Sequence, residues 1–266
     1  MSRQGCRETM RALSPLIAAL WMAVTAPALA DGSRLDVILK RQVLRVGTTG
    51  DYRPFTALDK GTGGYSGFDV DMARALAKAL GVSIAFEPIT WSGLAKGLAD
   101  GDFDIAMGGV SVTLDRQKIG FFSEPYMRDG KTPIARCSDQ AKYQTLADID
   151  RSGVTVIANP GGTNERFDRA HLHAADILIY PDNLTIFDQL AAGRANLMIT
   201  DASETRFQAK MHPGVLCAIH PDQPVDFAEK AYWMPPDPAL KAFVDQWLHQ
   251  AKEDGEFDAL YDKWFR

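Results

Sequence analysis

The stretch GVTVIANPGGTNERFDRAHLH, residues 153–173, contains the unit that decides the fold. Its first part, 153–159, is a short apolar run rich in β-branched residues, which is typical of a buried strand. A loop with two glycines follows, and 163–173 then has the length and composition of a surface helix. The stretch therefore predicts a strand that leads through a glycine-containing loop into a helix.

The same unit recurs on both sides of this stretch. Further strands are predicted at 43–49, 82–89, 103–109, 175–181 and 195–200. Further helices are predicted at 69–81, 92–101, 146–149 and 184–193, and we predict that Asp69 caps the first of them and that Gly81 ends it. This alternation favours an α/β protein of two lobes, each with a mainly parallel sheet flanked by helices.

The end of the chain, residues 238–265, is predicted to form two amphipathic helices without a strand of their own. Such helices must cover an existing sheet, and we expect them to dock on the first lobe. The chain then crosses between lobes twice, near 130–132 and again within 221–232. The predicted lobes are 31–130 together with 230–266, and an inserted lobe of 131–229.

The first thirty residues have the pattern of a secretory signal. Three arginines precede the apolar run 16–26, and Ala28-Leu29-Ala30 follows it. Cleavage before Asp31 is predicted, which would place the protein in the periplasm without membrane insertion. A membrane anchor is the alternative, but the apolar run is short for a membrane span.

The net charge disfavours two classes of partner, and the cysteine content indicates a disulfide. The chain has 29 basic and 34 acidic residues, a net charge of −5, which disfavours nucleic acids and anionic membranes. Cys137 and Cys217 remain after the predicted cleavage, and in an oxidising compartment they favour a disulfide between the start and end of the inserted lobe. Two separate thiols are the alternative to the disulfide. The sequence leaves open whether the protein forms a homo-oligomer.

The ligand site of an open α/β sheet lies beyond the carboxyl ends of its strands. The loops at these ends hold most of the unusual chemistry of the chain: 48–55, 88–93, 108–116, 159–166 and 200–204.

In the loop 108–116, two glycines permit close approach of the backbone to a ligand. Ser111 and Thr113 offer hydroxyl groups, and Arg116 offers a planar fork suited to a carboxylate. The alternative is that Thr113 caps a short helix and that Arg116 is solvated.

The loop 159–166 places two glycines and Thr163 at the start of a helix, where backbone N–H groups favour an anion. Thr163 as an ordinary N-cap is the alternative. Phe55 and Trp91 lie at loop edges, where each would either cover a ligand or complete a core. Lys131 lies at the first lobe crossing, where it would either face the cleft or be solvated.

Two carboxylates, Asp201 and Glu204, follow the strand that ends at Thr200. An Asp three residues before a Glu at a helix start is first of all a capping box. The pair also lies where the cleft is expected, so a binding or catalytic role is the alternative.

The sequence has no nucleophile elbow of the type G-x-S-x-G and no dinucleotide fingerprint of the type G-x-G-x-x-G. His171 and His173 lack a matching cluster of metal ligands. Neither a metal nor another cofactor is predicted.

Several stretches resemble the extracytoplasmic solute-binding proteins of polar amino-acid importers, over essentially the whole chain after the signal. They are LRVGTTGDYRPF, GGYSGFDVDMARALAKALG, LADGDFDIAMGGVSVTLDRQKIGFFSEPY and NPGGTNE. The resemblance implies the two-lobed periplasmic-binding-protein fold of type II with two hinge crossings. It also implies that Arg116 and Thr163 hold a ligand carboxylate and that Asp201 holds an ammonium.

The stretches YMRDGKTPI, TDASETR and DFAEKAY are similar to an enzymatic branch of that family. This branch comprises decarboxylating dehydratases, which are carbon–oxygen lyases that convert prephenate to phenylpyruvate and L-arogenate to L-phenylalanine. The resemblance implies that Glu204 is the general acid, with Lys131 and Trp91 in the active site.

Such an acid must keep its proton near neutrality, which requires burial and the neighbouring Asp201 charge. Arg116 and Lys131 would bind the two carboxylates of a dianionic substrate, in a pairing that the sequence leaves open. Asp51 and Asn164 complete the candidate substrate-binding residues. The alternative is an amino-acid-binding receptor of an ABC importer without catalytic activity, and the features that favour the enzyme are Glu204 and Lys131.

Overall fold

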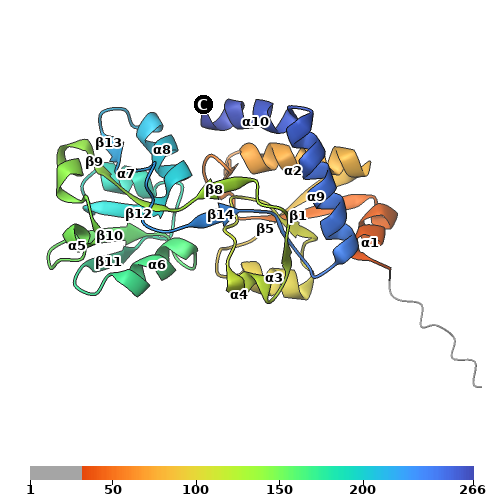
Figure 1. Ribbon diagram of the computed structural model, residues 1–266, viewed down its shortest axis with the longest axis horizontal. Helices are drawn as coiled ribbons and strands as arrows, with labels where there is room; N and C mark the ends of the chain where they lie inside the picture. The colour runs from red at the N-terminus through yellow and green to blue at the C-terminus, as the bar shows by residue number, and fades with distance from the viewer. Residues whose placement is uncertain (1–31) are drawn as a thin grey trace, which may run out of the picture. The chain divides into compact units, whose positions relative to one another are not determined.

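The computed structural model describes residues 32–266, so the predicted signal and its cleavage before Asp31 lie outside the described residues. None of the helices between Gly32 and Arg266 is long and apolar enough to cross a membrane. The described chain is built around two five-stranded sheets (Figure 1).

The first sheet has the strand order β5-β1-β6-β15-β7. Its strands are β1 (Val43–Thr48), β5 (Ser83–Pro88), β6 (Ile105–Ala106), β7 (Phe121–Phe122) and β15 (Trp233–Met234). Its helices are α1 (Arg34–Arg41), α2 (Phe68–Leu80), α3 (Leu94–Asp100), α4 (Leu114–Gln117), α9 (Pro238–Glu253) and α10 (Glu256–Phe265). β1 runs parallel to β5 and β6, whereas β15 runs antiparallel to β6 and β7.

The second sheet has the strand order β11-β10-β12-β9-β13. Its strands are β9 (Lys131–Arg136), β10 (Thr155–Ala158), β11 (Asp176–Ile179), β12 (Leu197–Asp201) and β13 (Leu216–Ala218). The helices that follow these strands are the short 3-10 helix η1 (Cys137–Lys142), α5 (Leu146–Ile149), α6 (Thr163–His171), α7 (Ile186–Ala191) and α8 (Ala202–Met211). β10 is parallel to β11 and β12, and β9 is antiparallel to β12 and β13.

In each sheet, one strand is inserted between two strands from another part of the chain. β15, which follows the second sheet in the chain, lies between β6 and β7, and β9 lies between β12 and β13. Each sheet is therefore mixed, because the inserted strand runs antiparallel to both of its neighbours. The predicted two-lobed α/β fold with helices flanking each sheet is confirmed, with an antiparallel half in each sheet that strand–helix alternation does not reveal.

The chain passes from one sheet to the other along two paired strands, β8 (Met127–Asp129) and β14 (Ala228–Lys230). A further small sheet is formed by β2 (Asp51–Tyr52), β3 (Thr56–Leu58) and β4 (Tyr65–Ser66). The second crossing strand falls in the predicted range 221–232, whereas β8 ends one residue before the predicted range 130–132. The exact lobe limits, 31–130 with 230–266 and 131–229, stay a prediction.

The two C-terminal helices complete the core of the first sheet. Trp247 and Leu248 of α9 and Phe257 of α10 are buried in one cluster with Leu44 of β1 and Phe68 of α2. Full burial of such side chains contributes roughly 2 kcal/mol each. The predicted docking of these helices on the first lobe is thus confirmed.

The prediction that Asp69 caps the helix at 69–81 is wrong. The N-cap of α2 is Gly67, and Asp69 lies inside the first turn. Its buried carboxylate accepts hydrogen bonds from the backbone N–H of Gly109, at 2.5 Å, and from the Tyr126 hydroxyl, at 2.8 Å. Asp69 therefore anchors the glycine loop of the first sheet. The C-terminal prediction is confirmed, because Gly81 ends α2 with a left-handed φ of 69°.

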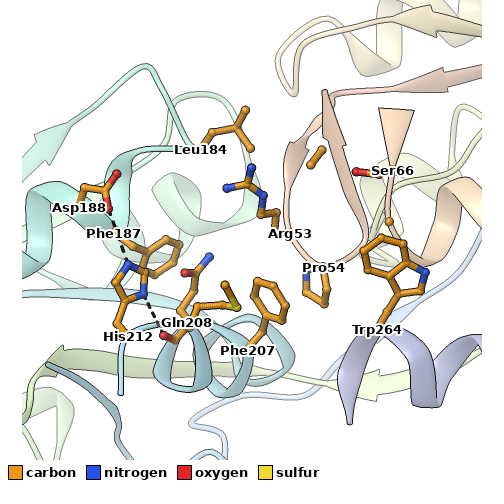
Figure 2. Close-up of a pocket in the computed structure, with 13 residues that line it drawn as sticks. Arg53, Pro54, Ser66, Leu184, Phe187, Asp188, Phe207, Gln208, His212 and Trp264 are labelled. Carbon is orange, nitrogen blue, oxygen red and sulfur yellow. Dashed lines mark hydrogen bonds and ion pairs between the residues drawn. The ribbon is translucent and has the colours of Figure 1, made fainter. Parts of the chain in front are cut away.

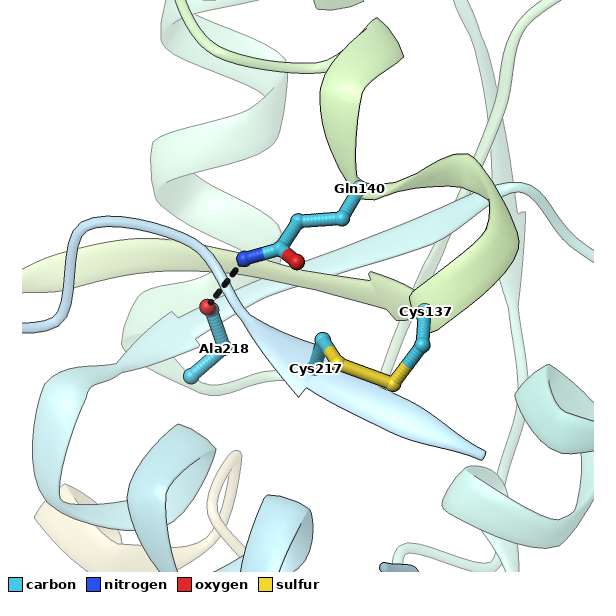
Figure 3. Close-up of a disulfide and its surroundings, with 4 residues drawn as sticks. All are labelled: Cys137, Gln140, Cys217 and Ala218. Carbon is cyan, nitrogen blue, oxygen red and sulfur yellow. Dashed lines mark hydrogen bonds between the residues drawn. A yellow bond between two sulfur atoms is a disulfide. The ribbon is translucent and has the colours of Figure 1, made fainter. Parts of the chain in front are cut away.

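The predicted disulfide between Cys137 and Cys217 is present, with the two Cα atoms 4.8 Å apart (Figure 3). Cys137 begins η1 directly after β9, and Cys217 lies in the neighbouring strand β13. The amide of Gln140 donates a hydrogen bond to the Ala218 carbonyl beside the bridge, at 3.3 Å. The bridge links the first and last strands that the chain contributes to the second sheet.

We predict that replacing both cysteines by serine lowers the free energy of unfolding by about 4 kcal/mol, because a link over 80 residues restricts the unfolded chain strongly. Urea unfolding of the two proteins measures the difference. A reducing agent should lower the midpoint of the natural protein and leave that of the double variant unchanged. Equal midpoints without reductant would contradict the prediction.

Candidate functional site

A small cavity lies where loops from both sheets meet. Its lining residues come from all five loops singled out in the sequence and from the segment after β11: Tyr52, Trp91, Gly109, Ser111, Asn159, Gly162, Thr163, Asn164, Asn183 and Asp201. The space left between them is about 20 Å³, enough for a single water molecule. The structure therefore brings the carboxyl ends of strands from both sheets to one place, which is where the sequence predicted the ligand site.

Asp201 lies at the centre of the site and is almost completely buried. Its Oδ1 accepts a hydrogen bond from Lys131 Nζ at 2.7 Å, and its Oδ2 is bound by Lys230 Nζ and by the Tyr52 hydroxyl. Burial opposes the charge of Asp201, but the two ammonium groups outweigh it and hold the pKa of this carboxyl below its ordinary range. Asp201 is thus an anion held by two cations.

The register of the second sheet produces the first of these contacts. Asp201 at the end of β12 lies directly opposite Lys131 at the start of β9 in an antiparallel pair, so both side chains point to the same face. The Lys131 ammonium also binds Thr163 Oγ1 at 2.9 Å and Asn164 Oδ1 at 2.5 Å. Lys131 therefore faces the cleft, and Thr163 is not an N-cap, since Gly162 precedes the helix in that role.

Lys230 is a site residue that the sequence analysis missed. Its side chain is fully buried, and its ammonium contacts Asp201, Ser111 Oγ at 3.0 Å and the Tyr52 hydroxyl at 3.3 Å. It also lies 5.1 Å from the centre of the Tyr52 ring and 5.7 Å from that of Phe55. The available signal was a lysine directly before the apolar run 231–234, at the end of the second crossing.

Glu204 lies in the first turn of α8 and is 1% exposed. Its Oε2 accepts a hydrogen bond from Thr200 Oγ1 at 2.6 Å, and Thr200 accepts one from Asn164 Nδ2 at 2.9 Å. The carboxyl is therefore connected to the cavity through Thr200 and Asn164. The capping box is absent, because the Asp201 side chain makes no capping hydrogen bond.

The environment of Glu204 favours its protonated form. Burial raises its pKa to about 8, and the negative charge of Asp201 adds to this effect. The Thr200 hydrogen bond and the more distant charges of Lys230 and Lys131 oppose it without cancelling it. Two carboxyl groups three residues apart thus have opposite pKa shifts, which is the arrangement that separates an acid from an anion.

Arg116 is buried, contrary to the alternative that it is solvated. Its Nη1 donates a hydrogen bond to the Ser111 carbonyl at 2.8 Å, and it makes no ion pair with any residue of the described chain. Burial lowers its pKa to about 10, so it stays a cation at neutral pH. Thr113 does cap the short helix α4, since its hydroxyl accepts a hydrogen bond from the Arg116 backbone N–H at 3.2 Å.

The aromatic candidates separate into one wall residue and one core residue. Trp91 lines the cavity, and its indole N–H donates a hydrogen bond to Asp51 Oδ1 at 3.1 Å. Phe55 is fully buried behind Tyr52, with ring centres 5.1 Å apart, and does not line the cavity. Tyr52, and not Phe55, is therefore the aromatic residue of the loop 48–55 that lines the cavity. Gly109 must be glycine here, because a Cβ would come within 2.5 Å of the Tyr52 ring.

A larger cavity of about 450 Å³ is lined by residues of α7, α8 and α10 and of the loops near them (Figure 2). Its walls are mainly apolar and include Pro54, Phe187, Phe207 and Trp264. None of the predicted site residues lines it. In the described part of the chain, no group of His, Cys, Asp and Glu side chains is arranged to hold a metal ion. The charged cluster around Asp201 is therefore the candidate functional site.

Comparisons with known proteins agree on one family. Residues 44–266 match the bacterial extracellular solute-binding proteins, family 3. Cyclohexadienyl dehydratase of Pseudomonas aeruginosa is 52% identical over 97% of this chain and 95% of its own length.

Two crystal structures cover 88% of this chain. The structure of an ancestral amino acid-binding protein, a precursor of cyclohexadienyl dehydratase, is 38% identical with a TM-score of 0.81 and is covered completely. The structure of an ancestral cyclohexadienyl dehydratase is 51% identical with a TM-score of 0.56 and is covered to 97%.

We predict that Asp201→Asn lowers the free energy of unfolding by about 3–5 kcal/mol, because it leaves two buried ammonium groups without their counter-ion. Urea unfolding at neutral pH measures the loss. Asp222→Asn is the matched control, since Asp222 forms an ion pair with Arg206 at 2.7 Å but is 89% exposed. Its loss should stay below about 1 kcal/mol. Similar losses in both variants would show that the buried cluster does not stabilise the fold.

Proposed function

Because this chain belongs to the bacterial extracellular solute-binding proteins, family 3, and is a homologue of a carbon–oxygen lyase of that family, we propose that it is a cyclohexadienyl dehydratase. The proposed reactions are the conversion of prephenate to phenylpyruvate and of L-arogenate to L-phenylalanine. With the predicted signal, the proposed location is the periplasm. The observation that carries the proposal is the buried Glu204, whose raised pKa keeps a proton on a carboxyl that is connected to the cavity through Thr200 and Asn164.

The proposed reaction needs a proton at the ring hydroxyl that leaves. The C–O bond of the ring hydroxyl breaks with its electron pair leaving on oxygen, and Glu204 supplies the proton that makes the leaving group water. The bond between the ring and its carboxylate breaks at the same time, so that carbon dioxide departs and its electron pair completes the aromatic ring. Glu204 regains its proton from water before the next turnover.

The cations of the site suit a substrate with two carboxylates. Arg116 has one hydrogen bond within the protein and retains N–H groups for a planar, bidentate contact with a carboxylate. The Lys131 ammonium contacts Thr163 and Asn164, which line the cavity, and would attract the other carboxylate. Trp91, which forms a wall of the cavity, would pack on the ring.

Substrate entry requires the cleft to open. The present cavity of about 20 Å³ is far smaller than the several hundred Å³ of a typical small-molecule site. Contacts between the loops of the two sheets at the edge of the cleft include the exposed ion pair of Lys60 with Asp182 at 3.1 Å and the bond from Asn183 to the Asp51 carbonyl at 2.9 Å. Closure over the substrate would exclude water from Glu204.

An amino-acid-binding receptor is the second candidate, and the similarity to an ancestral amino acid-binding protein favours it. Such a receptor needs a carboxylate free to bind the ligand's ammonium. Both oxygens of Asp201 already bind ammonium groups of the protein itself. This observation favours the dehydratase, whose substrate prephenate has no ammonium, and the 52% identity to cyclohexadienyl dehydratase supports the same choice. Stabilisation by an intact amino acid, without turnover of prephenate, would favour the receptor.

We predict that Glu204→Gln lowers kcat for prephenate by at least about 100-fold, because an amide cannot donate the proton that the leaving hydroxyl requires. Formation of phenylpyruvate from prephenate measures the rate. Glu253→Gln, an exposed change of the same kind on α9, should retain the rate of the natural protein. Turnover by Glu204→Gln at the natural rate would disprove the role of Glu204.

The pH dependence of kcat/KM should follow the protonation of Glu204. The acid is active when protonated, so kcat/KM should be constant below the pKa of Glu204 and fall as pH rises through about 8. Steady-state rates between pH 6 and 10, roughly two units either side of that pKa, test the direction. An activity that instead rises across pH 8 would mean that the essential group acts as a base.

A further inference from the structure

The Lys230 ammonium lies in a complete ammonium-binding cage. The cage supplies a carboxylate oxygen of Asp201, the hydroxyl of Ser111, the hydroxyl of Tyr52 and the faces of the Tyr52 and Phe55 rings. A primary ammonium has three N–H donors, and these three acceptors satisfy them. The same set of groups would equally bind the ammonium of a free amino acid.

The cage lies between the cavity and the strand β14 that carries Lys230. Asp201, Ser111 and Tyr52 all line the cavity, whereas Lys230 enters from β14 behind them and is fully buried. Residue 230 is held there by a backbone bridge to Ser111. The protein thus places its own ammonium where a ligand's ammonium would otherwise find its acceptors.

From this geometry we propose that Lys230 is a specificity-determining residue that makes the cleft prefer a keto acid over the corresponding amino acid. The proposal rests on the proposed dehydratase function, in which prephenate and L-arogenate differ by one such replacement. A ligand with an α-ammonium meets a cage that is already filled and adds a third cation beside Lys131 and Lys230. A keto acid adds none.

The total charge of the cluster leads to the same preference. Removing the Lys230 ammonium takes one positive charge from the cluster and leaves Asp201 Oδ2 with the Tyr52 hydroxyl as its partner. An amino acid brings one positive charge that a keto acid lacks. The cluster without the Lys230 charge, when occupied by the amino acid, therefore has the same total charge as the natural cluster occupied by the keto acid.

Lys230→Met tests the proposal, because methionine keeps the length of the side chain and lacks the terminal ammonium. We expect the ratio of kcat/KM for L-arogenate to kcat/KM for prephenate to rise at least about tenfold, a change of about 1.4 kcal/mol in relative transition-state binding. Lys78→Met, an exposed lysine on α2, should leave the ratio unchanged. An unchanged or lowered ratio in Lys230→Met would overturn the proposal.

Two further variants separate selectivity from damage to the fold. Lys230→Gln removes the charge but retains an N–H donor for Asp201, and its ratio should shift in the same direction even if Lys230→Met is too unstable to purify. In Asp201→Asn/Lys230→Met the carboxylate is also absent, so the gain for the amino acid should disappear. A gain that persists in the double variant would show that it does not arise from the vacated cage.

Binding of the two products gives a readout that does not depend on turnover. Calorimetric dissociation constants for L-phenylalanine and phenylpyruvate should show the same relative shift of at least about tenfold toward the amino acid in Lys230→Met. If no protein turns over either substrate, the proposed function fails, while the ratio of these constants still decides the role of Lys230. A ratio that does not change on substitution overturns the proposal independently of catalysis.

Discussion

The structure depends on one constraint: Asp201 is a buried anion that must hold two buried cations. An ammonium group withdrawn from water costs several kcal/mol unless an opposite charge and further acceptors surround it. Lys131 and Lys230 satisfy this need with one shared carboxylate, and the hydroxyls of Ser111, Thr163 and Tyr52 complete their hydrogen bonds. The polar lining of the cavity follows from that requirement.

This cluster also connects the parts of the chain that must act together. Asp201 and Lys131 belong to the second sheet, Lys230 belongs to a strand between the sheets, and Tyr52 belongs to the first lobe. Separation of the lobes would break the Tyr52 contact while the Lys131 contact stays within one sheet. Opening of the cleft would therefore change the surroundings of these charges, to which Glu204 is connected through Thr200 and Asn164.

Local features of the fold were predictable because neighbouring residues decide them. The strand–loop–helix units, the end of α2 at Gly81 and the cap of α4 at Thr113 follow from periodicity and turn chemistry. Predictions failed where a distant residue competes for a side chain. Asp69 binds Gly109 instead of its own helix, and Asp201 binds two lysines instead of forming a capping box with Glu204.

By itself, the sequence determined the fold class, the cysteine pair and the loops that meet at the site, since strand ends in such a fold gather at one edge. Tertiary structure alone decided which charges meet. Lys131 is 70 residues from Asp201 and Lys230 is 29 residues from it, and antiparallel register and strand crossing bring them together. The two ammonium groups, which no local pattern places, then separate an ionised Asp201 from a protonated Glu204 that is buried to the same degree three residues later.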